Sequence, residues 1–108
     1  MINEMRFFDE ATSTGVSKTM INTKGGILTI QATGTANTFE FAVSGCVNLE
    51  SNLFEPIKGI NVSDFSLAET VKENGIYEYD ISGIRQLRVN ISSIDGGTLT
   101  VMGISKEG

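Results

Sequence analysis

The chain has 108 residues, the length of one domain, and a formal net charge of −5 at pH 7. A negative chain repels phosphate backbones and anionic lipid surfaces, which argues against nucleic acid and membranes as partners. Histidine is absent and cysteine occurs once, which removes histidine-based catalytic triads, the usual zinc ligand sets and internal disulfides.

The first fourteen residues are predicted to form an N-terminal arm (1–14) ahead of a single domain that spans 15–108. The arm has no long apolar run, so we expect neither a signal peptide nor a membrane anchor. Phe7 and Phe8 are expected to tuck this arm against the core or against a neighbouring molecule. Removal of residues 1–10 is therefore expected to leave the thermal unfolding transition nearly unchanged.

Alternation of apolar and polar residues is the main signal in the next part of the chain, and it predicts antiparallel strands with one buried face. Two such runs, 26–33 and 38–47, flank a predicted hairpin turn at 34–37. Gly45 interrupts the second run, which indicates a bulge or a close approach of two backbones. The positions assigned to the buried face are Leu28, Ile30, Ala32, Phe39, Phe41, Val43 and Val47.

The stretch from residue 48 to residue 70 is less regular. Pro56 excludes a central strand, because proline has no N–H to donate to a neighbouring strand. We therefore predict that 53–57 crosses between two sheets and that short strands follow at 60–62 and 65–67.

Three alternating runs complete the chain at 77–81, 86–91 and 98–101. Asp95-Gly96-Gly97 separates the last two and predicts a hairpin, since glycine accepts a positive φ without steric cost. The positions assigned to the buried face are Tyr77, Tyr79, Ile81, Leu87, Val89, Ile91, Leu99 and Val101. Seven to eight short strands separated by turns predict an all-β fold, an antiparallel β-sandwich of the Ig-like or jelly-roll-like kind.

Few side chains suit catalysis. Cys46 has no neighbouring positive charge to activate its thiol, so it is interpreted as a small strand side chain. Glu78 and Asp80 share a strand face about 7 Å apart, which suits a glycosidase but is equally typical of a solvated face. Arg85 and Arg88 are expected to pair with these carboxylates. We therefore predict a protein that is not an enzyme, with no catalytic residue, cofactor or metal.

Aromatic residues outside the alternating runs are the candidates for a docking surface, because aromatic anchors dominate the energetics of interfaces. They also suit stacking on sugar rings, so a carbohydrate-binding module is an alternative, although the chain has no tryptophan. The four candidates are Phe7, Phe8, Phe54 and Phe65.

Several strings resemble small β-sandwich virion proteins of tailed bacteriophages and prophages, of the capsid decoration, head-fibre or tail-accessory type. The strings are ATSTG at 11–15, FEFAVSGC at 39–46, GIYEYDISG at 75–83, LRVNI at 87–91 and GGTLTV at 96–101. The resemblance implies a structural protein that docks in many copies on the virion, foremost a capsid decoration protein on the outer capsid surface, made in the bacterial host cytoplasm.

The partners implied by the resemblance are the major capsid protein or another virion protein, together with further copies of the chain in a homo-oligomer such as a trimer. The alternatives are a tail or baseplate accessory protein and a carbohydrate-binding module for host-surface glycans.

Overall fold

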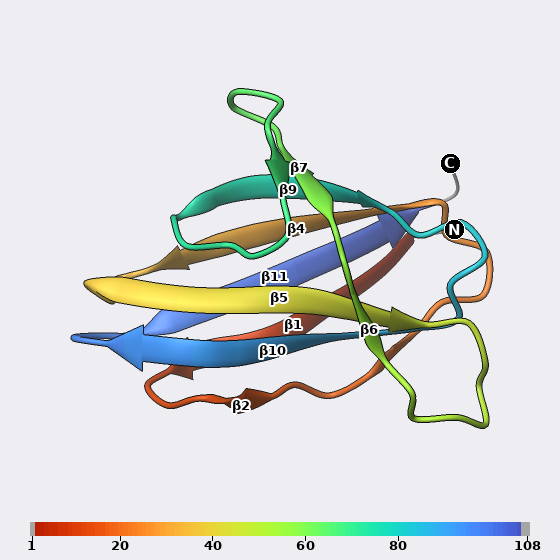
Figure 1. Ribbon diagram of the computed structural model, residues 1–108, viewed down its shortest axis with the longest axis horizontal. Helices are drawn as coiled ribbons and strands as arrows, with labels where there is room; N and C mark the ends of the chain where they lie inside the picture. The colour runs from red at the N-terminus through yellow and green to blue at the C-terminus, as the bar shows by residue number, and fades with distance from the viewer. Residues whose placement is uncertain (1, 107–108) are drawn as a thin grey trace.

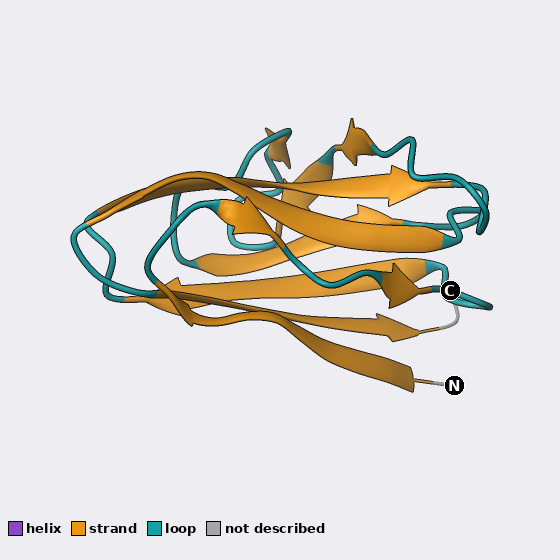
Figure 2. Ribbon diagram, turned by 90° about the horizontal axis from the view of Figure 1, so that it is seen from below, coloured by secondary structure: helices purple, strands orange, loops and turns teal. Residues whose placement is uncertain are grey.

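In the computed structural model, which describes residues 2–106, the chain forms two stacked antiparallel sheets (Figures 1 and 2). Sheet A has the strand order β1-β11-β4-β9-β7-β8, and sheet B has the order β2-β10-β5-β6, with β3 also paired to β10. The predicted β-sandwich is confirmed. The strands are β1 (Ile2–Ala11), β2 (Gly15–Val16), β3 (Met20–Ile21), β4 (Ile27–Gly34), β5 (Thr38–Cys46), β6 (Glu55–Ile57), β7 (Gly59–Asn61), β8 (Leu67–Ala68), β9 (Gly75–Asp80), β10 (Gln86–Asp95) and β11 (Leu99–Lys106).

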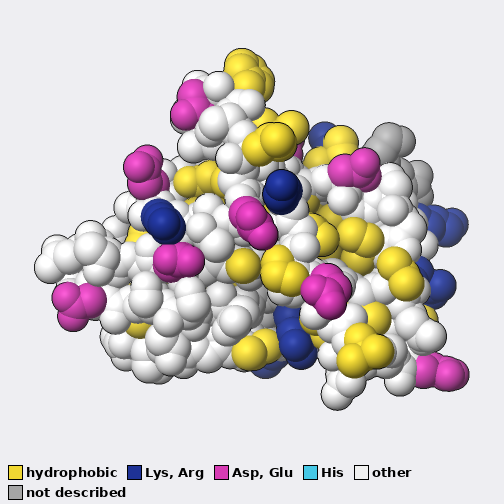
Figure 3. Space-filling model, viewed as in Figure 1, with side chains coloured by type: hydrophobic (Ala, Val, Ile, Leu, Met, Phe, Trp, Pro, Cys, Tyr) yellow, Lys and Arg dark blue, Asp and Glu magenta, His cyan; other side chains and the backbone are white. Residues whose placement is uncertain are grey.

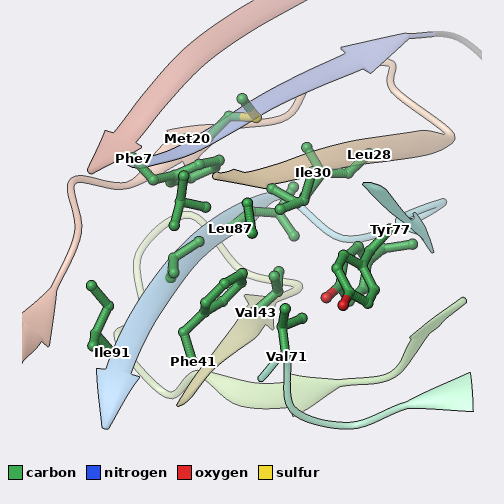
Figure 4. Packing of buried hydrophobic residues seen from close by; sticks show 14 of the residues in the cluster. Phe7, Met20, Leu28, Ile30, Phe41, Val43, Val71, Tyr77, Leu87 and Ile91 are labelled. Atoms are coloured by element: carbon green, nitrogen blue, oxygen red, sulfur yellow. The ribbon is translucent and has the colours of Figure 1, made fainter. Parts of the chain in front are cut away.

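The alternating apolar stripes form the core between the sheets. In Figure 4, Leu28 and Ile30 from β4 lie across from Phe41 and Val43 from β5. All the positions assigned to the buried face are buried except Val47, which is 71% exposed because β5 ends one residue earlier. Each fully buried side chain of this kind contributes about 1.5–3 kcal/mol to stability.

Residues 2–11 differ from the predicted arm, because they form β1, an edge strand of sheet A paired with β11. The pairing has two register shifts, and the first falls between Arg6 and Phe8. At such a bulge two residues oppose one partner residue, which allows Phe7 to be buried and Phe8 to pack partly on the core. The division into an arm (1–14) and a domain (15–108) is thus replaced by one sandwich that begins at β1; residues 1 and 107–108 lie outside the described residues.

Both turns predicted to close hairpins connect the two sheets instead. The turn at 34–37 leads from β4 in sheet A to β5 in sheet B, and the turn at 95–97 leads from β10 in sheet B to β11 in sheet A. The turns lie side by side, and the Thr35 N–H donates to the Thr98 carbonyl at 2.9 Å. The glycines reverse the chain as expected, with a φ of 75° at Gly96. The residues of a turn do not decide which strands pair. Here β4 pairs with β11 and β9, and β10 pairs with β5, β2 and β3, rather than each pairing with the strand that follows it in the chain.

The irregular stretch supplies short strands at the sheet edges. Pro56 lies in β6, the edge strand of sheet B, where its missing N–H costs no ladder hydrogen bond. The chain then crosses to sheet A, where β7 and β8 form a hairpin at the edge. Five of the eleven strands have only two or three residues, which explains why the sequence predicts fewer.

Candidate docking surfaces

The four phenylalanines predicted to dock lie in four different environments. Phe7 is only 5% exposed, and Phe8 is half-buried against the core, so neither is free to anchor a partner. Phe54 is half-buried beneath the guanidinium of Arg88, whose Cζ lies 3.9 Å from the ring centroid. Phe65 is 80% exposed. Of the four, Phe65 is therefore the one that remains a strong docking candidate.

Phe65 lies at the tip of the β7–β8 hairpin, which extends beyond the body of the molecule at the top of Figure 1. Short-range hydrogen bonds hold this tip. Asp64 Oδ1 accepts from the Ser66 N–H at 3.0 Å and from its hydroxyl at 2.7 Å, and these bonds lower the pKa of Asp64. The Phe65 N–H donates to the Asn61 carbonyl at 2.7 Å. The hairpin therefore presents its tip in a defined conformation.

The backbone of Phe65 has a φ of 60°, in the left-handed region that residues other than glycine rarely adopt. Such a conformation costs on the order of 1 kcal/mol or more. Burial of the ring within the chain does not offset this cost, because the side chain is exposed. A strained position with an exposed aromatic ring is typical of a functional surface rather than of a part that serves stability alone.

The base of the hairpin is anchored on Tyr79 of β9. A Cβ atom at Gly59 would lie 2.5 Å from the Tyr79 ring, so only glycine allows β7 to approach this closely. Burial raises the pKa of the Tyr79 phenol well above its ordinary value. The hairpin is thus fixed to the core at its base and exposed at its tip.

Exposed apolar side chains cluster on the hairpin and on the neighbouring strand β9. Ile60 is paired with Leu67, and directly paired residues share a sheet face. The Val62 N–H donates to the Ile76 carbonyl at 3.0 Å, which brings β9 alongside. Figure 3 shows apolar side chains at the hairpin tip. We call this set the hairpin patch; its members, 39 to 80% exposed, are Ile60, Val62, Phe65, Leu67 and Ile76.

The outer face of sheet A continues from the hairpin patch into a shallow hollow of about 520 Å³. Ile76 belongs to both, and Met102 and Ile104 of β11 add further apolar surface. The hollow is lined by Glu4, Met5, Arg6, Thr29, Gln31, Ile76, Met102, Gly103 and Ile104. An apolar surface that joins a projecting hairpin to a hollow is typical of a protein interaction site.

A second apolar surface, the loop patch, lies on the loop between β5 and β6. Gln86 Nε2 holds this loop over sheet B, because it donates to the carbonyls of Asn48 at 2.6 Å and Ser51 at 2.9 Å. The buried Cys46 thiol donates to the same Asn48 carbonyl at 3.3 Å. The exposed apolar side chains of the loop patch are Val47, Leu49 and Leu53.

The sequence predicts Phe65 as a docking residue but no other member of the hairpin patch or the loop patch. Leu67 and Leu53 lie in irregular segments where no alternation indicates which side chains are exposed, and Val47 continues the alternation of β5 beyond the end of the strand. The nearest signal is the position of these residues beside turn-forming asparagine and serine.

The predicted pairing of Arg85 and Arg88 with Glu78 or Asp80 is wrong, because neither arginine forms an ion pair within residues 2–106. The two carboxylates lie on β9 of sheet A, whereas Arg88 lies on β10 of sheet B and stacks on Phe54. The side chains of Glu78 and Asp80 are both exposed, as a solvated face requires.

Within residues 2–106, no group of three or more histidine, cysteine, aspartate or glutamate side chains is placed to hold a metal ion. In the same part of the chain, no helix is long and apolar enough to cross a membrane.

Comparison with known proteins shows a family and a shared fold. The XepA family model matches residues 2–105. The SPBc2 prophage-derived protein YomS aligns with a TM-score of 0.88 and 23% identity, over 97% of this chain and 92% of YomS. The PBSX exported protein XepA aligns with a TM-score of 0.90 and 24% identity, over 97% of this chain and 37% of XepA. At these identities the two structures establish the fold. No curated protein matches the chain.

Proposed function

The chain belongs to the XepA family, and from this membership we propose that it is a phage or prophage protein that works by docking rather than by catalysis. The two proteins with the same fold are described as prophage-derived and as an exported protein of PBSX, which supports a phage origin. The observation that carries the docking role is the hairpin patch, with the strained and 80% exposed Phe65 at its tip.

We further propose that the docking site is the virion, with the chain acting as a capsid decoration protein on the outer capsid surface. In this proposal many copies, grouped as a homo-oligomer such as a trimer, bind the major capsid protein or another virion protein. Ligands that bind only the assembled state stabilise it by mass action, so an attached small domain stabilises a shell without an active site. A projecting apolar hairpin suits this role, because apolar and aromatic anchors contribute most of the binding energy at interfaces.

A second candidate follows from the description of PBSX XepA as an exported protein. In this candidate the chain acts outside the cell and free of the particle, and the hairpin patch binds a partner at the host surface. The identity between the two chains is 24%, and this chain spans 37% of the length of XepA, so the activity of that whole protein is not transferred.

Density-gradient fractionation of a lysate in which the encoding phage is produced tests the proposal. We expect the full-length chain to sediment with the particles, and a Phe65→Asn/Leu67→Ser variant to lose about tenfold or more of this association, since each truncated anchor costs about 1 kcal/mol or more. Leu53→Ser in the loop patch is the matched control and is expected to sediment as the wild type does.

The possible results separate the candidates. A wild-type chain found only in the soluble fractions of the gradient, apart from the particles, overturns decoration and supports the second candidate. Undiminished sedimentation of the Phe65→Asn/Leu67→Ser variant removes the hairpin patch from the proposal.

A further inference from the structure

A second hollow lies at one end of the sandwich, between the loop that joins β3 to β4 and the loop that joins β9 to β10. Its volume is about 600 Å³. None of the residues that line it is acidic, although the chain as a whole carries a net charge of −5. Figure 3 shows positively charged side chains at the right-hand end of the molecule, where Figure 1 places these loops. The lining residues are Asn22, Thr23, Lys24, Gly25, Gly26, Ser82, Gly83, Ile84 and Arg85.

The buried side chain of Asn22 fixes the two loops relative to each other. Its Nδ2 group donates to the carbonyls of Gly25 at 3.1 Å, Ile81 at 3.3 Å and Ile84 at 2.8 Å. Its Oδ1 accepts from the Gly25 N–H at 2.7 Å. One side chain thus joins both loops, so the shape of the hollow is set before any ligand binds.

Positive charge and hydrogen-bond donors converge on this hollow. Lys24 and Arg85 are exposed, and neither forms an ion pair within residues 2–106. The N–H groups of Thr23, Lys24 and Gly83 donate to no other group of the described chain. The nearby carboxylate of Asp80 accepts from the Ser82 N–H at 3.1 Å. The hollow therefore offers two cations and several free donors on a rigid frame.

We propose that this hollow binds a small phosphate anion, either inorganic phosphate or a phosphate monoester. Arginine forms paired hydrogen bonds with phosphate oxygens, lysine adds a point charge, and clustered loop N–H groups form anion-binding concavities. The negative charge of the whole chain disfavours a long polyanion but leaves a small anion free to enter a locally positive hollow. The site shares no residue with the hairpin patch or the loop patch, so it is independent of the proposed function.

Titration of the full-length chain with sodium phosphate, followed by ¹H–¹⁵N correlation spectra at constant ionic strength, tests the proposal. We expect saturable shifts of the Thr23, Lys24 and Gly83 amides. The Lys24→Gln/Arg85→Gln variant is expected to bind about tenfold or more weakly, since it loses both cationic side chains that would form hydrogen bonds with the phosphate oxygens. The Lys18→Gln/Lys58→Gln variant removes the same charge from exposed sites outside the hollow and is expected to bind as the wild type does.

Parallel titrations with glycerol phosphate and with phosphatidylglycerol vesicles identify the source of the phosphate. Saturation by phosphate or by glycerol phosphate supports the site and shows whether the free or the esterified group is preferred. Binding to vesicles alone overturns it, because the ligand is then a membrane surface. Shifts that grow linearly with phosphate, or that are equal in both double variants, also overturn it. Unchanged shifts of core amides in each variant confirm that the fold is intact.

Discussion

Replacement of Phe7 by alanine tests whether β1 belongs to the core. Phe7 lies in the core in Figure 4, and a Cβ atom at Gly103 would approach its ring within 2.6 Å. Burial of a phenylalanine contributes about 1.5–3 kcal/mol, and the cavity left by its removal raises the cost to about 3–5 kcal/mol. Because domains of this size are stable by only about 5–15 kcal/mol, we expect the melting temperature to fall by roughly 15 °C or more.

Phe65→Ala is the matched control, because it removes the same ring from an exposed position. About one fifth of a phenylalanine surface of roughly 200 Å² is buried there, which corresponds to about 1 kcal/mol at most. Urea unfolding followed by far-UV circular dichroism measures both free energies, and equal slopes show that the two transitions expose similar surface.

Equal midpoints for the Phe7→Ala and Phe65→Ala variants would refute the placement of β1 in sheet A and restore the arm predicted from the sequence. The structure makes the opposite prediction for a chain that lacks residues 1–10. That chain loses the whole β1–β11 ladder as well as Phe7, so it is expected to be less stable than the Phe7→Ala variant.

Three further outcomes follow from the structure. Gly59→Ala places a Cβ atom against the Tyr79 ring and is expected to lower the free energy of unfolding by about 1–3 kcal/mol, so an unchanged urea midpoint would contradict the close approach. Burial raises the pKa of Tyr79 above the value of 10.0 of an exposed phenol. The contribution of the buried phenol to stability is therefore complete below pH 10 and decreases as the pH rises further. A urea midpoint at pH 11 equal to that at pH 9 would count against the burial of Tyr79. Hydrogen bonds from Ser66 lower the pKa of Asp64 below 3.8. The stabilisation of the hairpin tip by the Asp64 carboxylate is therefore present above pH 3.8 and is lost as the pH falls through the lowered pKa. A chemical shift of the Ser66 amide that changes with a midpoint at or above pH 3.8 would argue against these bonds.

The sequence predicts the core well because burial on one face of a strand leaves a period of two in the side chains. The prediction fails where a strand ends or bulges while the alternation of apolar and polar residues in the sequence continues. Val47 continues the alternation after β5 has ended, and the bulge at Phe7 lets neighbouring aromatic residues both reach the core. Turn sequences identify reversals at 34–37 and 95–97, yet strand pairing depends on distant segments that compete for each edge.

The docking surfaces are only partly predictable for a related reason. Phe65 is recognisable as an aromatic residue outside any alternating run, but Phe7, Phe8 and Phe54 satisfy the same criterion and pack inward or under Arg88. The hollow between the loops depends on Asn22, whose partners lie up to 62 residues away in the chain. Contacts over such separations leave no local pattern.

The irregular course of β1 affects whether the edge of sheet A can pair with a strand of another molecule. A straight, long outer strand with free backbone groups is a template for uncontrolled fusion of sheets into fibres. Two bulges break the regular spacing of those groups in β1, and the opposite margin of sheet A ends in a strand of two residues. Both margins of sheet A are therefore poor templates for pairing, edge to edge, with a strand of another molecule.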